Sequence, residues 1–220
     1  MKKILTPLLT LLILLSAYQA VAGKKKFFTG KITYSIDIQM DNLPEEARAM
    51  LPTTMVMYVG EHHIKTVLFT QMGKQISILD LKNKTKTTLL DMMGKKMAII
   101  TSTDEIQKEL EQAPDYTVEK TDETREIAGL ECIKILVKEN DDEGNEEVVS
   151  TGWFTDAYHV NPEMNFDDPF YKDVDGLLLE FGIEARGGMH MPFSAKEIEE
   201  KKIKEKVFEV PDDYEIKTAD

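Results

Sequence analysis

The sequence predicts a mainly β protein in which one antiparallel sheet carries two or three short helices. Three observations support this class. Segments with alternating apolar and polar residues recur along the chain, and short polar turns separate many of them. Few segments carry the start and stop signals of helices. No repeat of fixed period and no long linker divides the chain, so a single sheet with helices against it fits the pattern.

The first 22 residues have the pattern of a signal peptide. Lys2 and Lys3 precede an apolar run over residues 4–15, and Ala20-Val21-Ala22 is a small-x-small cleavage site. The run is too short to span a bilayer as a helix. We therefore expect cleavage after Ala22, export to the periplasm or beyond, and a single domain over residues 23–220. The alternative is an uncleaved N-terminal anchor.

The charge balance excludes several classes of partner. The 27 lysines and arginines, less Lys2 and Lys3, leave 25 against 40 acidic residues. Such an acidic surface disfavours binding to nucleic acid and anionic membranes, because both require a positively charged contact surface on the protein. No second apolar run has membrane length, so we expect a soluble monomer after cleavage. Cys132 is the only cysteine, which excludes an internal disulfide, and its apolar segment favours a buried thiol.

Residues 28–40 give the clearest strand pattern. Their apolar positions fall on one face and their polar positions on the other. The apolar face contains Ile32, Tyr34, Ile36, Ile38 and Met40. At ~3.3 Å per residue such a strand would be about 35–40 Å long. Strands of this length usually curl, which favours a barrel or part-barrel over a flat sandwich.

Two segments before the middle of the chain predict helices. Residues 42–52 have Pro44 near their start and end at Pro52. Residues 102–111 begin with Ser102 and Glu105 at the spacing of a capping box and are followed by Pro114. The segments that predict strands in this half are residues 53–59, 64–71, 75–81, 85–92 and 95–101.

The second half predicts an antiparallel meander over residues 124–185. Two apolar strands, 130–138 and 147–155, flank an acidic turn, and residues 177–185 add another strand. Residues 156–175 lack a period and predict an irregular loop with one helical turn. Its acidic pair Asp167-Asp168 is expected to be solvated.

The C-terminal part is less clear. Residues 189–193 alternate as a strand, whereas residues 194–206 carry opposite charges at helical spacing. We predict a charged edge strand there, because charged edges prevent unwanted pairing between sheets. Residues 208–214 are expected to form an extended, docked tail.

The sequence lacks the groups that catalysis requires. It contains no Gly-x-Ser-x-Gly elbow, no Gly-rich phosphate loop and no His-Glu-x-x-His motif. The neighbours His62 and His63 would point to opposite faces of a strand, which is poor geometry for chelation. The acidic loop 139–147 resembles a calcium loop, but the twelfth position is Ser150 rather than glutamate. We therefore expect no enzyme, no resident metal and no cofactor.

Soft-metal binding is a third hypothesis, based on Met189-His190-Met191. Methionine sulfurs in an exported protein can bind Cu(I). In a strand, however, the two methionines would share one face and His190 would lie on the other.

The remaining candidate site is an apolar surface on one side of the sheet. Methionine and aromatic side chains suit an adaptable pocket for acyl chains. The alternative is an ordinary filled core. The candidate lining residues are Tyr34, Ile36, Met55, Met57, Phe69, Trp153, Leu179, Phe181, Met189 and Met191.

Several motifs, taken in order, resemble an uncharacterised family of exported bacterial proteins with the fold of the lipoprotein carriers LolA and LolB. The motifs are the signal peptide and residues 30–34, 78–85, 127–132, 153–155, 176–180 and 208–214. The resemblance implies a long antiparallel sheet curled into an unclosed half-barrel. It also implies helices that plug the open side and acyl chains held inside.

We therefore expect a periplasmic, non-enzymatic binding or carrier protein for an apolar or amphiphilic ligand, such as a lipid or a lipidated protein. The alternatives are a cell-envelope scaffold or interaction module with a filled core, and the soft-metal binder. Cavity volume distinguishes the first two, because a carrier needs a pocket of several hundred Å³ and a scaffold has a close-packed interior.

Overall fold

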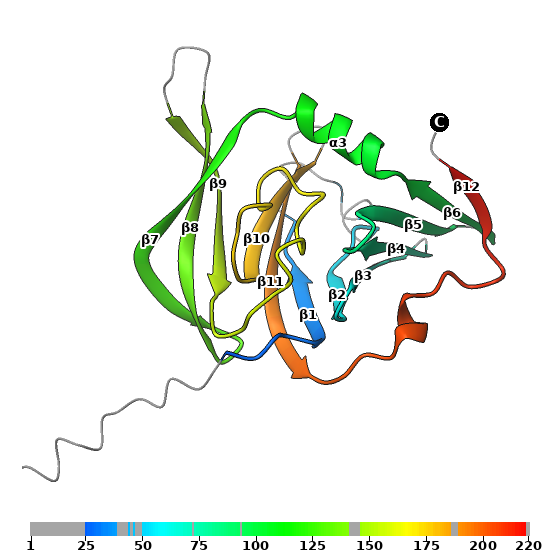
Figure 1. Ribbon diagram of the computed structural model, residues 1–220, viewed down its shortest axis with the longest axis horizontal. Helices are drawn as coiled ribbons and strands as arrows, with labels where there is room; N and C mark the ends of the chain where they lie inside the picture. The colour runs from blue at the N-terminus through cyan, green and yellow to red at the C-terminus, as the bar shows by residue number, and fades with distance from the viewer. Residues whose placement is uncertain are drawn as a thin grey trace, which may run out of the picture.

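Twelve strands form a single sheet that does not close into a barrel (Figure 1). The computed structural model describes residues 25–38, 44, 46, 50–71, 73–92, 94–140, 146–185 and 189–218. The predicted signal peptide lies outside these residues. The strands are β1 (Gly30–Ile36), β2 (Thr54–Val59), β3 (His63–Thr70), β4 (Gly73–Asp80), β5 (Thr85–Met92), β6 (Lys95–Thr101), β7 (Tyr116–Ile127), β8 (Leu130–Asn140), β9 (Glu146–Thr155), β10 (Leu177–Ala185), β11 (Met189–Glu200) and β12 (Glu215–Thr218).

The strand order explains why the sheet has two open edges. It runs β12-β6-β5-β4-β3-β2-β1-β11-β10-β9-β8-β7, and only β12 and β6 pair in parallel within the described part of the chain. The strands β2 to β6 extend the sheet in one direction from β1 as consecutive hairpins. The strands β7 to β11 return from the far edge, so β1 and β11 meet in the middle.

The helix α3 (Thr103–Gln112) crosses between the two sides of the curled sheet, because it connects β6 to β7 (Figure 1). Its predicted capping box is confirmed. The Glu105 amide donates to Ser102 Oγ at 3.3 Å, and the Ser102 amide donates to the Glu105 carboxylate at 2.6 Å. Where the chain is described, no helix is long and apolar enough to cross a membrane.

The mainly β class and the unclosed sheet are confirmed, whereas the number of helices is wrong. The described residues contain one α-helix, α3, and one short 3₁₀ turn, η2 (Glu205–Phe208), instead of two or three helices. The helix expected over residues 42–52 falls largely outside the described residues. β1 is also shorter than expected, with seven residues, or about 23 Å at ~3.3 Å per residue. β1 is thus shorter than the strand from which curvature was predicted, whereas β7 and β11 have 12 residues each.

The strand predicted over residues 194–206 is present only as far as Glu200, and Glu205 and Lys206 belong to η2. The strand is not at an edge, because it continues β11, which lies between β1 and β10. Its charges are accommodated by pairs across the strands: Lys31 on β1 is opposite Glu199, and their side chains are 2.6 Å apart.

Apolar residues pack on both faces of the sheet. Adjacent residues of a strand point to opposite faces, and in β4 Leu79 belongs to the larger core while Ile78 belongs to a smaller cluster. The C-terminal tail covers the smaller cluster with Phe208, Val210 and Tyr214, and then adds β12 at the edge. The expected docking of the tail is confirmed, and we call this covered side the outer face.

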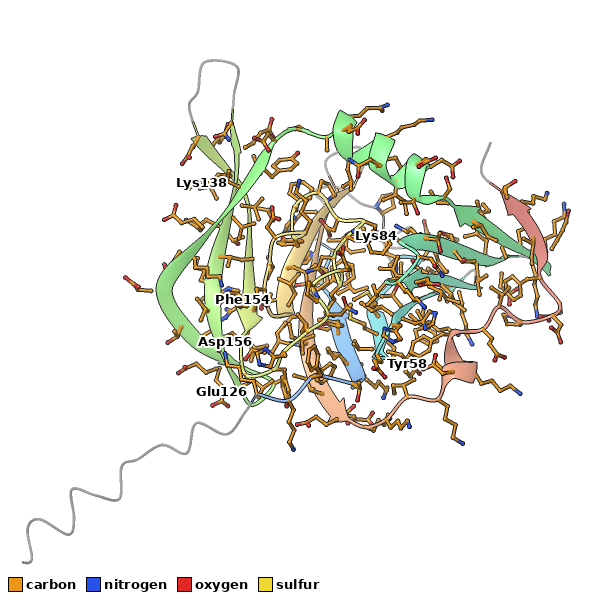
Figure 2. All side chains as sticks on the ribbon, in the orientation of Figure 1. Tyr58, Lys84, Glu126, Lys138, Phe154 and Asp156 are labelled. Atoms are coloured by element: carbon orange, nitrogen blue, oxygen red, sulfur yellow. The ribbon has the colours of Figure 1, made fainter. Side chains whose placement is uncertain are left out.

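The loop over residues 156–176, drawn in yellow, packs against the inner face (Figure 1). It buries Met164, Tyr171 and Val174 in the larger core. Two lysines near the β4–β5 turn hold it: Lys84 bonds Glu163 at 2.9 Å and Lys86 bonds Asp167 at 2.8 Å, and Lys84 is labelled in Figure 2. The helix α3 buries only Ile106. A loop, rather than a set of helices, therefore fills much of the half-barrel.

Candidate functional site

A cavity of about 500 Å³ lies between the inner face of the sheet and the loop that packs against it. Strands β1 to β5, β10 and β11 form most of its lining, and loop residues 164–170 contribute the rest. The volume falls in the range of small-molecule binding pockets. The interior of this half-barrel is therefore not completely filled by its own side chains.

The cavity has an apolar wall and a polar wall. The apolar wall comes from β1, β2, β10 and β11, and the polar wall from β3, β4 and β5, which also contribute the apolar residues Ile64, Leu68 and Leu79. The apolar wall includes Tyr34, Met55, Met57, Phe181, Met191 and Phe193. The polar wall includes Thr66, Gln75, Ser77, Lys86 and Thr88. A lining of this kind suits a molecule that has both an apolar chain and a polar group.

Five of the ten candidate residues line this cavity, and they are Tyr34, Met55, Met57, Phe181 and Met191. Ile36 and Leu179 are buried in the surrounding core without reaching the cavity. Met189 lies in β11 opposite Ala185, but its side chain is outside the described part.

Phe69 and Trp153 lie elsewhere. Phe69 is 41% exposed, next to the Lys74 ammonium group, which is 5.6 Å from its ring centroid. Its neighbour Leu68 points into the cavity instead. Trp153 packs beneath the Arg125 guanidinium, 4.1 Å from its ring centroid.

Tyr34 anchors the apolar wall. Its ring is fully buried, and its hydroxyl donates to the Leu178 carbonyl oxygen at 2.8 Å. Burial raises the pKa of Tyr34 above its ordinary value, so the hydroxyl stays neutral. The ring of Tyr34 packs edge-on against that of Phe181, with the ring centroids 5.7 Å apart. Phe181 in turn stacks on Phe193, with the ring centroids 5.0 Å apart. These contacts hold one side of the cavity in place.

Asp168 is the ionisable group that sequence analysis assigned wrongly. Instead of being solvated, it lines the cavity, and its Oδ1 accepts the amides of Phe170 at 2.8 Å and Tyr171 at 3.2 Å. Burial is the main reason that its pKa rises to about 6; the two amides and Lys86 act in the opposite direction. The neighbouring Asp167 is only 14% exposed and is paired with Lys86.

We predict that Asp168 makes the protein less stable as pH rises. Its pKa in the folded state, about 6, exceeds the ordinary value of about 3.9 in an unfolded chain. The folded state therefore binds more protons between these values, and the free energy of unfolding falls from about pH 4 to about pH 6, by at most about 3 kcal/mol.

Urea unfolding at pH 4.5, 5.5 and 7 measures this slope. Asp168→Asn should flatten it, whereas Asp175→Asn, at an exposed position of the same loop, should leave it unchanged. Equal slopes in the Asp168 variant and the unmodified protein would contradict the assignment.

A second, mostly apolar cavity of about 520 Å³ adjoins the first, since Ile64 and Met164 line both. Phe27, which is 70% exposed, lies at its rim. The side chains of Ile64 and Met164 therefore lie between the two spaces. Methionine side chains change rotamer at low cost, so this partition is adaptable.

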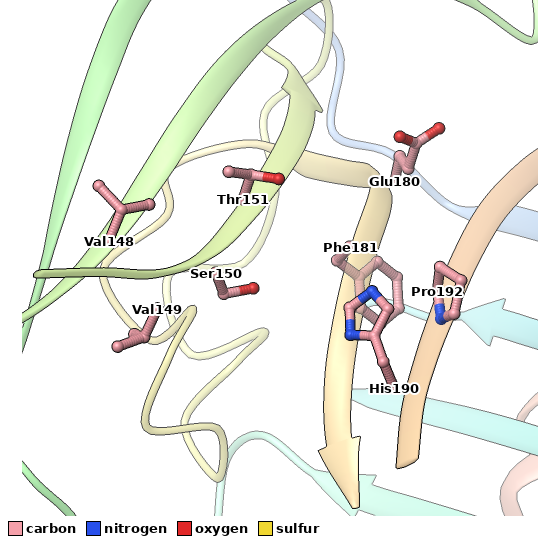
Figure 3. A pocket seen from close by; sticks show the side chains of 9 residues that line it. Val148, Val149, Ser150, Thr151, Glu180, Phe181, His190 and Pro192 are labelled. Atoms are coloured by element: carbon pink, nitrogen blue, oxygen red, sulfur yellow. The ribbon is translucent and has the colours of Figure 1, made fainter. Parts of the chain in front are cut away.

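Strands β9 and β10 separate soon after they pair. Their ladder covers only residues 153–155 and 177–180. Beyond it, the Tyr171 hydroxyl contacts Ser150 Oγ at 3.0 Å and donates to the Gly182 carbonyl oxygen at 3.3 Å. A shallow pocket of about 300 Å³ opens at this separation, between Ser150 on one strand and His190 on the other side (Figure 3).

The residues of the soft-metal candidate lie near this shallow pocket, on β11. Met191 lines the large cavity, whereas His190 lies at the shallow pocket, against Gly182. The two side chains therefore point to different sides of β11, as alternation along a strand requires.

The buried thiol of Cys132 has no access to this site. It is free and fully buried, as expected from the sequence, and burial raises its pKa to about 11. A thiol in this state is not an activated nucleophile.

Together, the fold and the site define an open half-barrel with a cavity of ligand size. No protein-family model and no curated protein sequence matches the chain. Among solved structures it is similar to PNGF-II, with 17% identity and a TM-score of 0.47 over 87% of this chain; it spans 32% of the PNGF-II chain.

Two further solved structures are similar to this chain. The lipoprotein LppX of Mycobacterium tuberculosis has 12% identity and a TM-score of 0.37, over 76% of this chain and 85% of that chain. A LolA superfamily protein from Nitrosomonas europaea has 7% identity and a TM-score of 0.35, over 86% of this chain and 92% of that chain.

Proposed function

We propose that this protein is a non-enzymatic binding or carrier protein for an amphiphilic ligand, either a lipid or a lipidated protein, and that it works in the periplasm. The observation that carries the proposal is the cavity of about 500 Å³ with its apolar and polar walls. The apolar wall would receive an acyl chain, and the polar wall would contact the head of the ligand.

The cavity favours this function over a scaffold with a filled core. A close-packed interior has few voids larger than a water molecule, whereas this one has space for a guest. Met55, Met57 and Met191 add flexible side chains to the apolar wall, which allows chains of different length to fit. We also propose that residues 23–220 act as one domain after removal of the signal peptide.

The test is to purify the protein from its own cell envelope and to analyse it by native mass spectrometry and solvent extraction. We expect a bound amphiphile in the native spectrum that disappears when the protein is unfolded and refolded without lipid. The refolded sample is the control for adventitious adducts. Repeated recovery of ligand-free protein from the native envelope would overturn the proposal.

A further inference from the structure

We propose that the cavity of about 500 Å³ lined by Asp168 selects amphiphiles with a positively charged head over anionic ones of the same chain length, and that Asp168 is the residue that selects. The inference rests on the proposed function, since it assigns a class of ligand to the same site. It starts from the charged groups of the cavity lining rather than from its apolar wall.

The lining contains more negative than positive charge. Its ionisable side chains with full charges are Lys86, Asp167 and Asp168. The Lys86 ammonium is 2.8 Å from Asp167 Oδ2, so this pair is already matched. Asp168 forms no ion pair among the residues that the structure describes, although Lys86 is close enough to lower its pKa.

One oxygen of Asp168 is available to a ligand. Its Oδ1 accepts the two loop amides of Phe170 and Tyr171. Within the described part of the chain, Oδ2 has no hydrogen-bond partner. Because Asp168 also lines the cavity, a ligand that enters it can reach a carboxylate with an unused acceptor.

A carboxylate in this position gains most from a cationic partner. Withdrawal of a charge from water is costly unless an opposite charge or hydrogen bonds compensate. An ammonium head would supply three donors and a positive charge, and hydroxyls such as those of Ser77 and Thr88 on the polar wall could accept further bonds. An anionic head would instead meet Asp167 and Asp168 in a chain whose net charge is −13.

The same geometry makes cation binding dependent on pH. Burial raises the pKa of Asp168 to about 6, so most of the carboxyl is protonated at pH 5 and almost none at pH 7.5. The other charged groups that face it are Asp167 and Lys86. Affinity for a cationic amphiphile should therefore rise with pH through about 6, and affinity for a neutral one should not.

The experiment compares three probes of one chain length on the delipidated full protein, all below their micelle concentrations: dodecylamine, dodecanol and dodecanoate. Calorimetry or displacement of a fluorescent probe gives the dissociation constants at pH 7.5. We expect dodecylamine to bind roughly tenfold or more tightly than dodecanoate, equivalent to about 1.4 kcal/mol, and to lose affinity several-fold at pH 5.

Asp168→Asn should remove most of the preference for the amine and its pH dependence, while dodecanol binds as before. Asp175→Asn, which removes an exposed charge from the same loop, should keep the preference and so controls for general attraction to the acidic surface. If the Asp168 variant does not fold, the pH series on the unmodified protein still tests the inference.

The outcomes separate the two proposals. Equal binding of amine and carboxylate, or a preference that survives in the Asp168 variant, would overturn the inference and leave the carrier function intact. If none of the three probes binds, both the proposed function and the inference fail.

Discussion

Replacing Met57 by tryptophan is expected to abolish uptake of an acyl-chain ligand while the protein stays folded. Met57 lies on β2 and lines the large cavity. An indole at this position would occupy space that a guest needs. Because the cavity is open, we expect the free energy of unfolding to change by no more than about 1 kcal/mol. A fluorescent fatty-acid analogue should bind at least about tenfold more weakly, as measured by titration beside urea unfolding.

Phe69 offers a matched control on the next strand. It lies on the opposite side of the sheet from the cavity and is 41% exposed. Phe69→Trp adds an indole of the same kind and should leave binding of the analogue unchanged. Unchanged affinity in the Met57 variant, or loss of affinity in the Phe69 variant, would show that ligands bind somewhere else.

Phe154→Ala is expected to cause the largest loss of stability, about 3–5 kcal/mol. Phe154 is fully buried on β9, and the Lys120 ammonium lies 4.9 Å from its ring centroid. Its ring packs so closely on Gly176 that a Cβ at that glycine would lie 2.3 Å from a ring carbon. Alanine would leave a hole that the surrounding strands cannot close. A loss of this size is a large part of the 5–15 kcal/mol typical of folded proteins.

Urea unfolding measures this loss as a lower midpoint at an unchanged slope. Phe69→Ala serves as the control, because it makes the same chemical change at a half-exposed site and should cost less than about 1 kcal/mol. A loss below about 1.5 kcal/mol for Phe154→Ala would show that β9 can repack around the missing ring.

The strands that sequence analysis placed well are those joined by short turns. Residues 53–59, 64–71, 75–81, 85–92 and 95–101 correspond closely to β2 to β6. Each carries a local period, and each pairs with its neighbour in the chain. Local signals were sufficient there, because hairpins need no information from distant residues.

The pairing of β1 with β11 was not predictable in the same way. Residues 194–200 carry dense charge, which is typical of an edge or a surface helix. They lie in the middle of the sheet because they pair with β1, where Lys31 is 168 residues from its partner Glu199 in the sequence. A single sequence contains no direct signal for a contact at this separation.

The cavity lining shows that the alternation of side chains along a strand does not by itself tell which face lies inside. Alternation places Val67 and Phe69 on one face of β3, and Thr66 and Leu68 on the other. Hydrophobicity favoured the Phe69 face as the inner one, but the cavity wall is the face with Thr66. On β3 both faces carry apolar residues, because Ile64 and Leu68 share the face of Thr66, so alternation alone could not assign the inner face and the polar wall was missed. Asp168 was missed because its loop has no period.

The central position of β1 has a consequence for biogenesis. β1 precedes β2 to β10 in the chain, yet one of its two edges stays unpaired until β11 has been synthesised. Until then the nascent chain exposes backbone donors and acceptors, which invite association with other chains. We therefore expect completion of the sheet to be a late step in folding, because it requires a contact between β1 and β11, which lie far apart in the sequence.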